Sequence, residues 1–381
     1  MLHASENEVP VARETRLAGA KHGQSLLQQG SKRRAPFGDV TNRVGAGAGD
    51  LDSQLAKDAK TRGSLGGADE VVVPAEASTR ANKAPAPLPL PDIDSADASN
   101  IFLASDYVVD IFSYFRRVEP RFRVAADYMK KQVDINEKMR AILVDWLSEV
   151  HLKFKLAPET MFLSVNLIDR FLEKKQVTRR NLQLVGVTAM LIASKYEEIW
   201  APEVRDFVYI SDKAYTREQI LECEHTMLNV LGFNLTLPTY YNFLSRYLKA
   251  AGKHMDKQVA CLSSYLAELA LVDAPMLKYS YSVTAAAAVF VASLAVAPKK
   301  RSSELYPMPL ERHSGYSLLK VGQCAAALID LMAKAPANKL AAVFKKYSSP
   351  KLLEVSKTPV PALNPEWAGD ADDMVIGCTD K

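Results

Sequence analysis

The chain has 381 residues, of which 48% are hydrophobic, and its formal net charge is +4 at pH 7. This length is enough for two or three domains of ordinary size, and so small a charge gives no basis for nucleic-acid binding. The longest apolar run, eight residues at 285–292, is too short to span a bilayer, so we expect no membrane partner. The first residues lack the pattern of a signal peptide, and we expect none. The four cysteines form no Cys-x-x-Cys pair, which argues against zinc sites and disulfides and fits a reducing compartment.

Residues 1–95 differ in composition from the rest of the chain. They hold 10 of the 17 glycines and a single aromatic residue, Phe37, although the chain has 13 Phe, 15 Tyr and 3 Trp. So few large apolar groups cannot offset the entropy lost on ordering the segment. The sequence therefore predicts a disordered regulatory tail over residues 1–95, ending in a stiff, extended Pro-rich run at 84–91.

A short motif surrounds the lone aromatic residue of this tail. Arg34, Phe37, Val40 and Asn42 place a cation, two apolar groups and an amide along one short stretch. The pattern resembles the destruction box of mitotic cyclins, in which Leu usually stands where this chain has Phe37. That element binds the anaphase-promoting ubiquitin ligase as an extended peptide, with contacts that suit these side chains. The resemblance implies ubiquitin-mediated destruction.

From about residue 101 the chain is predicted to consist of helices joined by short turns. A short amphipathic helix starts near Tyr107 and ends near Pro120. Further helices are predicted at about 136–154, 158–174, 179–198, 203–210, 216–231, 239–251, 255–272, 281–297, 315–334 and 338–347. Pro158 and Thr216 indicate two helix starts, and Gly232 indicates an end. No alternating strand pattern competes, so the predicted class is all-α.

The helix at 136–154 carries more apolar surface than one face can bury. Its polar residues Arg140, Asp145, Ser148 and Glu149 are too few for a full solvent face. The apolar residues of its first stripe are Met139, Ile142, Leu143 and Trp146, and those that continue the helix are Leu147, Val150 and Phe154. Such a helix is either central to a core or also forms a docking site. The pattern alone favours the core.

Two helices in the body of the chain echo each other. Val-Thr-Ala at 187–189 opens one apolar helix and Val-Thr-Ala at 283–285 opens another, and both contain an Ala-Ser pair further on. Each would be the third helix of a five-helix set. The echo suggests two related bundles in tandem.

No catalytic or metal-binding constellation is visible in the sequence. No two histidines have the spacing of a helical metal site, and the chain has neither a Gly-rich phosphate loop nor a Gly-x-Ser-x-Gly motif. The histidines are His3, His22, His151, His225, His254 and His313. We therefore expect no cofactor and no enzymatic activity.

Several segments together resemble the cyclin box, in the order and spacing of that family. They are residues 139–147, 169–172, 182–186, 193–198 and 202–204, and residues 345–349 are similar to the segment that closes the second cyclin fold. Residues 151–156 and 199–202 resemble B-type more than A-type mitotic cyclins. The resemblance implies tandem cyclin folds: an N-terminal fold at 101–235 that includes the preceding helix, a C-terminal fold at 236–355, and a flexible tail at 356–381.

The resemblance also implies a function, namely a regulatory subunit that binds and activates a cyclin-dependent protein kinase at the G2/M transition and in mitosis. It implies residence in nucleus and cytoplasm according to the cell cycle. Lys195 and Glu224 match the family residues that contact the kinase, and Phe207, Tyr107 and Ile111 are weaker candidates for that interface.

A second implied site recruits substrates that carry Arg-x-Leu. Its apolar residues would receive the Leu, and Glu149 would face the Arg. The residues that match this docking patch are Met139, Ile142, Leu143, Trp146, Glu149, Leu182 and Gln183.

Two other classes of function remain open at this point. A tandem cyclin-fold transcription scaffold would show a zinc ribbon or a basic face, and an all-α enzyme would show a cluster of metal or acid–base residues. The sequence contains neither signature.

Overall fold

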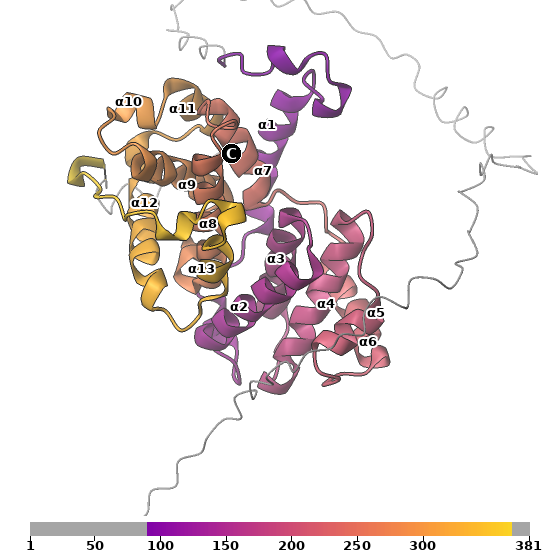
Figure 1. Ribbon diagram of the computed structural model, residues 1–381. Coiled ribbons are helices and arrows are strands. Elements are labelled where there is room, and N and C mark those ends of the chain that lie inside the picture. The colour runs from indigo at the N-terminus through magenta and orange to yellow at the C-terminus, as the bar shows by residue number, and fades with distance from the viewer. Residues whose placement is uncertain (1–89, 368–381) are drawn as a thin grey trace, which may run out of the picture. The chain divides into compact units, whose positions relative to one another are not determined.

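A computed structural model describes residues 90–367, and their regular structure consists of α-helices and short 3-10 helices without a strand (Figure 1). The first half of this range contains α1 (Val108–Val118), α2 (Glu137–Phe154), α3 (Pro158–Lys174), α4 (Arg179–Glu197), α5 (Val204–Ile210) and α6 (Arg217–Leu231). The second half contains α7 (Tyr240–Ala250), α8 (Lys257–Val272), α9 (Tyr281–Val296), α10 (Ser302–Leu305), α11 (Met308–Ser314), α12 (Leu318–Lys334) and α13 (Ala342–Tyr347). The predicted all-α class is confirmed.

Short 3-10 helices occupy several of the connections. They are η1 (Ser95–Asp97), η2 (Ile101–Leu103), η3 (Glu119–Phe122), η4 (Tyr128–Lys131), η5 (Ala274–Lys278), η6 (Ala335–Ala337), η7 (Pro350–Leu352), η8 (Val355–Lys357) and η9 (Pro365–Trp367).

The predicted start and stop signals act where the sequence places them. Pro158 is the first residue of α3, where its missing N–H costs nothing. Thr216 and Gln219 form a capping box at the start of α6. Gly232 ends α6 in the left-handed region, with φ of +60°, which a residue without Cβ adopts freely.

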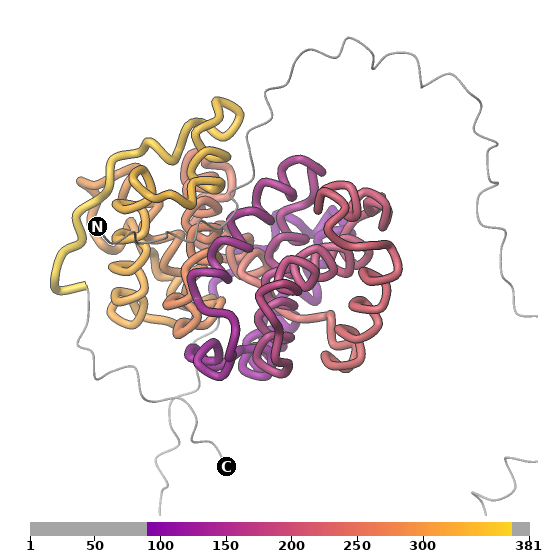
Figure 2. The backbone as a smooth tube through the Cα atoms, turned by 90° about the horizontal axis from the view of Figure 1, so that it is seen from below, coloured from indigo at the N-terminus to yellow at the C-terminus, as the bar shows by residue number. Residues whose placement is uncertain are grey.

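Each half of the described chain is built around one helix that is apolar on nearly all sides. In the first half α4 packs against α2, α3 and α6, and in the second half α9 packs against α7, α8 and α12. Thr188 and Thr284, from the two Val-Thr-Ala echoes, are both fully buried. Figure 2 shows the two halves as separate groups of helices, indigo to pink and orange to yellow. The predicted tandem arrangement is confirmed.

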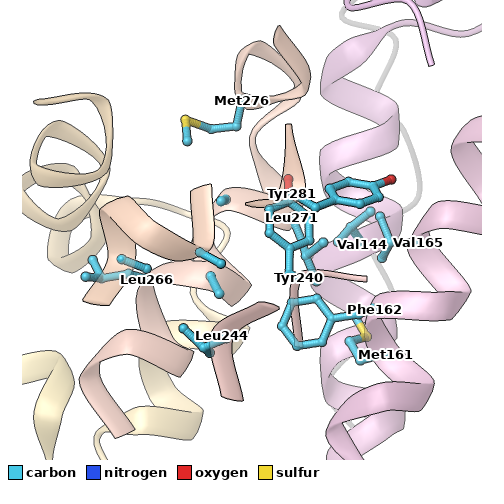
Figure 3. Packing of buried hydrophobic residues seen from close by; sticks show 14 of the residues in the cluster. Val144, Met161, Phe162, Val165, Tyr240, Leu244, Leu266, Leu271, Met276 and Tyr281 are labelled. Carbon is cyan, nitrogen blue, oxygen red and sulfur yellow. The ribbon is translucent and has the colours of Figure 1, made fainter. Parts of the chain in front are cut away.

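Aromatic and aliphatic side chains join the two halves (Figure 3). Val144 of α2 and Phe162 of α3 face Tyr240 of α7 and Tyr281 of α9, whose ring centroids are 4.4 Å apart. The Tyr281 hydroxyl accepts a hydrogen bond of 2.6 Å from the Asn166 side chain. Buried hydrophobic residues of both halves belong to one cluster, so the two halves share a continuous core.

A buried ion pair of the first half also reaches across the same interface through a hydrogen bond. Arg140 of α2 is 1% exposed, and its Nε and Nη2 lie 2.6 and 2.7 Å from the two carboxylate oxygens of Asp169 on α3. Its Nη1 donates to the carbonyl oxygen of Leu271, at the end of α8, over 2.9 Å. The Tyr128 hydroxyl also donates to Asp169. Arg140 is therefore a core residue that links both folds, whereas the sequence pattern placed it on a polar face.

The predicted helices differ from the observed ones mainly in the second half. Helices α10 and α11 were not predicted, because they are four and seven residues long and Pro307 and Pro309 obscure their period. The predicted helix at 315–334 begins later, because Gly315 ends α11 with φ of +73° and Ser317 caps α12. The predicted helix at 338–347 is shortened to α13.

Residues at both ends of the described range pack onto the second fold. Asp94 accepts hydrogen bonds from both terminal nitrogens of Arg246, at 2.6 and 2.8 Å, and from Lys249 at 2.6 Å. The His313 imidazole lies 2.9 Å from the carbonyl oxygen of Pro91. Near the other end, the Trp367 ring lies 5.7 Å from Phe290. Packed structure thus starts before residue 95 and continues beyond residue 356, inside both predicted tails.

Candidate partner-binding surfaces

The structure brings Lys195 and Glu224 together. Lys195 lies in the last turn of α4 and Glu224 lies in the middle of α6, two helices that pack against each other. The Lys195 ammonium donates to both carboxylate oxygens of Glu224, at 2.6 and 2.8 Å. The side chains are 46% and 14% exposed. The pair therefore lies at the surface, where it contributes less than about 1 kcal/mol to stability.

This ion pair can also bond a partner. An ammonium has three donors and a carboxylate about four acceptor positions, so each group keeps free capacity after pairing. A partner backbone presents both N–H and C=O groups and can engage both charges at once. The position of Lys195 at the C-terminus of α4 also favours its charge through the helix dipole.

The last turn of α4 and the loop after it expose apolar residues within five positions of Lys195. Ile199 and Trp200 are 91% and 90% exposed, and Tyr196 is also exposed. The backbone before them is fixed, because Glu198 accepts hydrogen bonds from Ala157 N at 2.7 Å and from the Thr160 hydroxyl at 2.5 Å. Sequence reasoning did not assign these side chains to a site. The available signal was two large apolar residues in a loop that precedes Pro202, outside any helical stripe.

Helix α1 carries a second exposed apolar surface. Phe112 and Phe115 pack against Phe243 of α7, with ring centroids 6.4 and 6.5 Å apart. Tyr107 and Ile111, two of the predicted interface residues, are exposed. Other exposed apolar residues near or in this helix are Ile101, Phe102, Leu103, Val109 and Tyr114. One face of α1 thus anchors the helix while the other remains available.

The prediction for Phe207 is wrong. Its side chain is fully buried in α5, and its ring lies 5.4 Å from Phe154 at the end of α2. A side chain with no exposed surface cannot contact a partner. Phe207 instead holds the short helix α5 against the first fold.

The predicted docking patch on α2 is partly exposed. Ile142 is 49% exposed, and Met139 and Trp146 are half-buried and pack against the core at their inner edges. Glu149 is exposed one turn further along, and Gln183 of α4 is half-buried. We call these five side chains the docking strip: three apolar groups and a carboxylate on α2, with an amide on α4, which packs against it.

Two other residues predicted for this patch belong to the core. Leu143 and Leu182 are each only 5% exposed. Leu143 packs so closely on Gly186 of α4 that a Cβ at that glycine would lie 2.6 Å from a Leu143 methyl carbon. Both residues support the strip from beneath and offer almost no surface of their own.

The predicted destruction-box residues Arg34, Phe37, Val40 and Asn42 lie outside the described residues. Within residues 90–367, no cluster of three or more His, Cys, Asp and Glu side chains is arranged to hold a metal ion. None of the helices in that range has the length and apolar character needed to cross a membrane.

Comparison with known proteins gives consistent matches. The family model "Cyclin, N-terminal domain" matches residues 110–236, and "Cyclin, C-terminal domain" matches residues 238–361. Cyclin-B2-1 of Oryza sativa subsp. japonica is 50% identical over 267 residues, which cover 70% of this chain and 62% of that protein. Cyclin-B2-1 of Arabidopsis thaliana is 47% identical, with coverage of 71% and 61%. The G2/mitotic-specific cyclin-2 of Medicago sativa is 47% identical over 70% of this chain and 79% of that protein.

The chain thus spans just over three fifths of the length of the two B2-1 relatives. Among solved structures, a viral cyclin from herpesvirus saimiri superposes with a TM-score of 0.54. The match covers 61% of this chain and 99% of the viral chain at 19% sequence identity, which is a likeness of fold.

Proposed function

The chain belongs to the cyclin family and resembles its B-type, mitotic members, and from this premise we propose that it is the regulatory subunit of a cyclin-dependent protein kinase. In this proposal it binds the kinase as a heterodimer, activates it at the G2/M transition and in mitosis, and supplies no catalytic residue. The observation that supports it most is the exposed Lys195–Glu224 pair at the end of α4, followed in the chain by exposed Ile199 and Trp200.

The mechanism is a shift in the conformational equilibrium of the kinase. A protein kinase positions ATP only when the lysine of its strand β3 pairs with the glutamate of its helix αC. A rigid surface that binds αC in its inward position favours the active state by its differential affinity for the two states. Moving a population from 1:99 to 99:1 takes about 5.5 kcal/mol.

The exposed apolar residues can supply this energy. Burying one large apolar side chain contributes about 1.5–3 kcal/mol. Ile199 and Trp200 are almost fully exposed in the free protein, and Tyr107 and Ile111 of α1 add further apolar area. Lys195 and Glu224 would fix the register of the kinase on this surface, because charge-assisted hydrogen bonds are directional.

The test replaces both charged residues together, Lys195→Ala with Glu224→Ala, so that neither charge is left unpaired. We expect the affinity for a cyclin-dependent kinase to fall at least about tenfold, the equivalent of one charge-assisted hydrogen bond. Helicity and the urea midpoint should change little. The matched control is Asp330→Ala with Lys334→Ala, an exposed pair on α12. Undiminished kinase binding by the first variant, or an equal loss in the control, would refute the role of the pair.

We also propose that the strip of Met139, Ile142, Trp146, Glu149 and Gln183 docks Arg-x-Leu substrates. Ile142 is exposed and lies about two turns before Glu149 on the same face of α2. This arrangement supports a contact with the leucine of the motif beside a contact with its arginine.

Destruction of the protein through the anaphase-promoting ubiquitin ligase is proposed from the motif at Arg34 and Phe37. Arg34→Ala with Phe37→Ala should extend the lifetime of the protein at mitotic exit, and an unaltered lifetime would place the degron elsewhere. Residence in nucleus and cytoplasm, changing with the cell cycle, is proposed with it. Imaging of a tagged chain through the cell cycle tests this.

A further inference from the structure

A large cavity lies between the two folds, and its rim meets the docking strip at Glu149. Its volume is about 1030 Å³, and it is lined by the last turns of α2, one side of α8, and α13 with the turn that follows. Leu152, Leu156, Phe162 and Leu352 contribute apolar lining. A cavity of this size accommodates several peptide side chains.

Lysines dominate the charge of this cavity. Five line it, Lys153, Lys155, Lys345, Lys346 and Lys351, against two carboxylates, Glu149 and Glu268. The Lys346 ammonium is committed to Glu268, at 2.7 and 2.8 Å. The other four lysines form no ion pair with any residue of the described part of the chain. The cavity is therefore suited to an anionic occupant with apolar groups.

One buried polar atom in the lining lacks a partner. His151 is 4% exposed, and its Nε2 lies 2.9 Å from the carbonyl oxygen of Ala157. Since a carbonyl only accepts, Nε2 carries the proton and Nδ1 is left as an acceptor. Nδ1 has no hydrogen-bond partner among residues 90–367. Buried polar atoms are normally paired, so this atom calls for an N–H or O–H donor, which a peptide backbone provides.

We propose that residues 368–381 of this same chain bind in the cavity. This segment contains four aspartates, at 370, 372, 373 and 380, and one lysine, with Met-Val-Ile at 374–376 between them. The negative charge of the aspartates is complementary to the positive charge of the lysines without an ion pair. The apolar triplet can pack against the apolar part of the lining. Fourteen extended residues reach about 46 Å from Trp367, while a small domain is about 30 Å across.

The cavity adjoins the proposed docking strip. Glu149 belongs to that strip and also lines the cavity, so a bound acidic segment would offset the lysines around it and strengthen its attraction for arginine-bearing substrates. Binding of the segment itself does not depend on the chain being a kinase activator.

The chain carries its own probes for this contact. Cys261 lines the cavity, Cys378 lies in the proposed occupant, and Cys223 on α6 is a half-buried comparison thiol outside the cavity. The full chain is treated with a short bismaleimide at low concentration, and cross-linked peptides are quantified by mass spectrometry. We expect the intramolecular Cys261–Cys378 product to exceed Cys223–Cys378 at least about fivefold. Equal yields would refute the proposal.

Charge reversal separates specific binding from chance collision. Asp370→Lys, Asp372→Lys and Asp373→Lys together should lower the Cys261–Cys378 yield at least about fivefold and speed alkylation of Cys261. Circular dichroism and the urea midpoint of each variant check that the folded core is unchanged. Lys345→Glu with Lys351→Glu should have the same effect, and combining both sets should restore the cross-link.

The matched control is Lys299→Glu with Lys300→Glu, two exposed lysines outside the cavity lining, which should change nothing. A cross-link insensitive to both charge reversals would overturn the proposal. So would concentration-dependent cross-linked dimers in place of the intramolecular product, because they would assign the cavity to a second copy. Alkylation of Cys261 at one rate in all variants would mean that the segment does not occupy the cavity.

Discussion

Replacing Asp169 by asparagine should cost the protein about 3–5 kcal/mol of folding free energy. The change preserves shape but removes the charge that compensates Arg140, which is 1% exposed and bonded to both Asp169 oxygens at 2.6 and 2.7 Å. Breaking one side of a buried ion pair carries a penalty of this order, because the remaining charge stays out of water. The asparagine amide would also turn a donor toward the guanidinium. The loss is a large part of a typical total stability of about 5–15 kcal/mol.

The decisive comparison is a double-mutant cycle with Arg140→Met. This change leaves Asp169 buried without its cation and frees the Leu271 carbonyl, so alone it should also destabilise strongly. Together, the two substitutions leave a neutral asparagine that can still accept from the Tyr128 hydroxyl. We expect the double variant to be at least about 2 kcal/mol more stable than the sum of the single effects implies. Urea titrations followed by fluorescence and circular dichroism measure this. Single losses below about 1 kcal/mol, or strict additivity, would contradict a buried, coupled pair.

The remaining predictions concern one exposed residue and two buried titratable groups. Ile142→Ala should lower kcat/KM about tenfold for Arg-x-Leu substrates and leave short peptides without the motif unaffected; equal losses would refute docking. Burial raises the pKa of Glu119, which accepts from Ser282 N and Oγ. Its contribution to stability therefore falls as pH rises from about 4.5 through the raised pKa, and Glu119→Gln should flatten that slope in urea titrations; an unchanged slope would count against it. Burial lowers the pKa of His313, so stability is lost as pH falls below its ordinary 6.5. Hydrogen exchange near Asp94, corrected for intrinsic rates, should be faster at pH 5.5 than at 7.5, and equal exchange would contradict this.

Much of the fold follows from local signals. The long helices carry clear periodicity and strong caps, so their bounds fall within a few residues of the prediction, as at Pro158 and Gly232. The short helices α10 and α11 could not be found this way. A helix of four or seven residues offers no full period, and its stability comes from packing, here the contact of both with α9.

The candidate sites show where sequence reasoning stops. Apolar character alone does not tell which side chains of α2 face outward, and Leu143 is buried only because α4 offers Gly186 opposite it. Family resemblance places Phe207 at the kinase interface, but its ring packs against Phe154 inside the fold. Arg140 looked like a solvent-facing cation, since its partner Asp169 stands 29 positions away on another helix. Lys195 and Glu224 were paired by family resemblance, and nothing in the local pattern connects them.

Helix α2 is covered by helices that come much later in the chain, and this has a consequence while the protein is being synthesised. Asp145 on α2 accepts a hydrogen bond of 2.9 Å from Ala342 N at the start of α13, 197 positions further along the chain. At about 5–20 residues per second, a ribosome needs about 10–40 s to make the intervening chain. During that delay one side of α2 has no cover. The nearby Asp169 is already available to Arg140, so the nascent first fold can neutralise its buried cation while it waits for α8 and α13 to emerge.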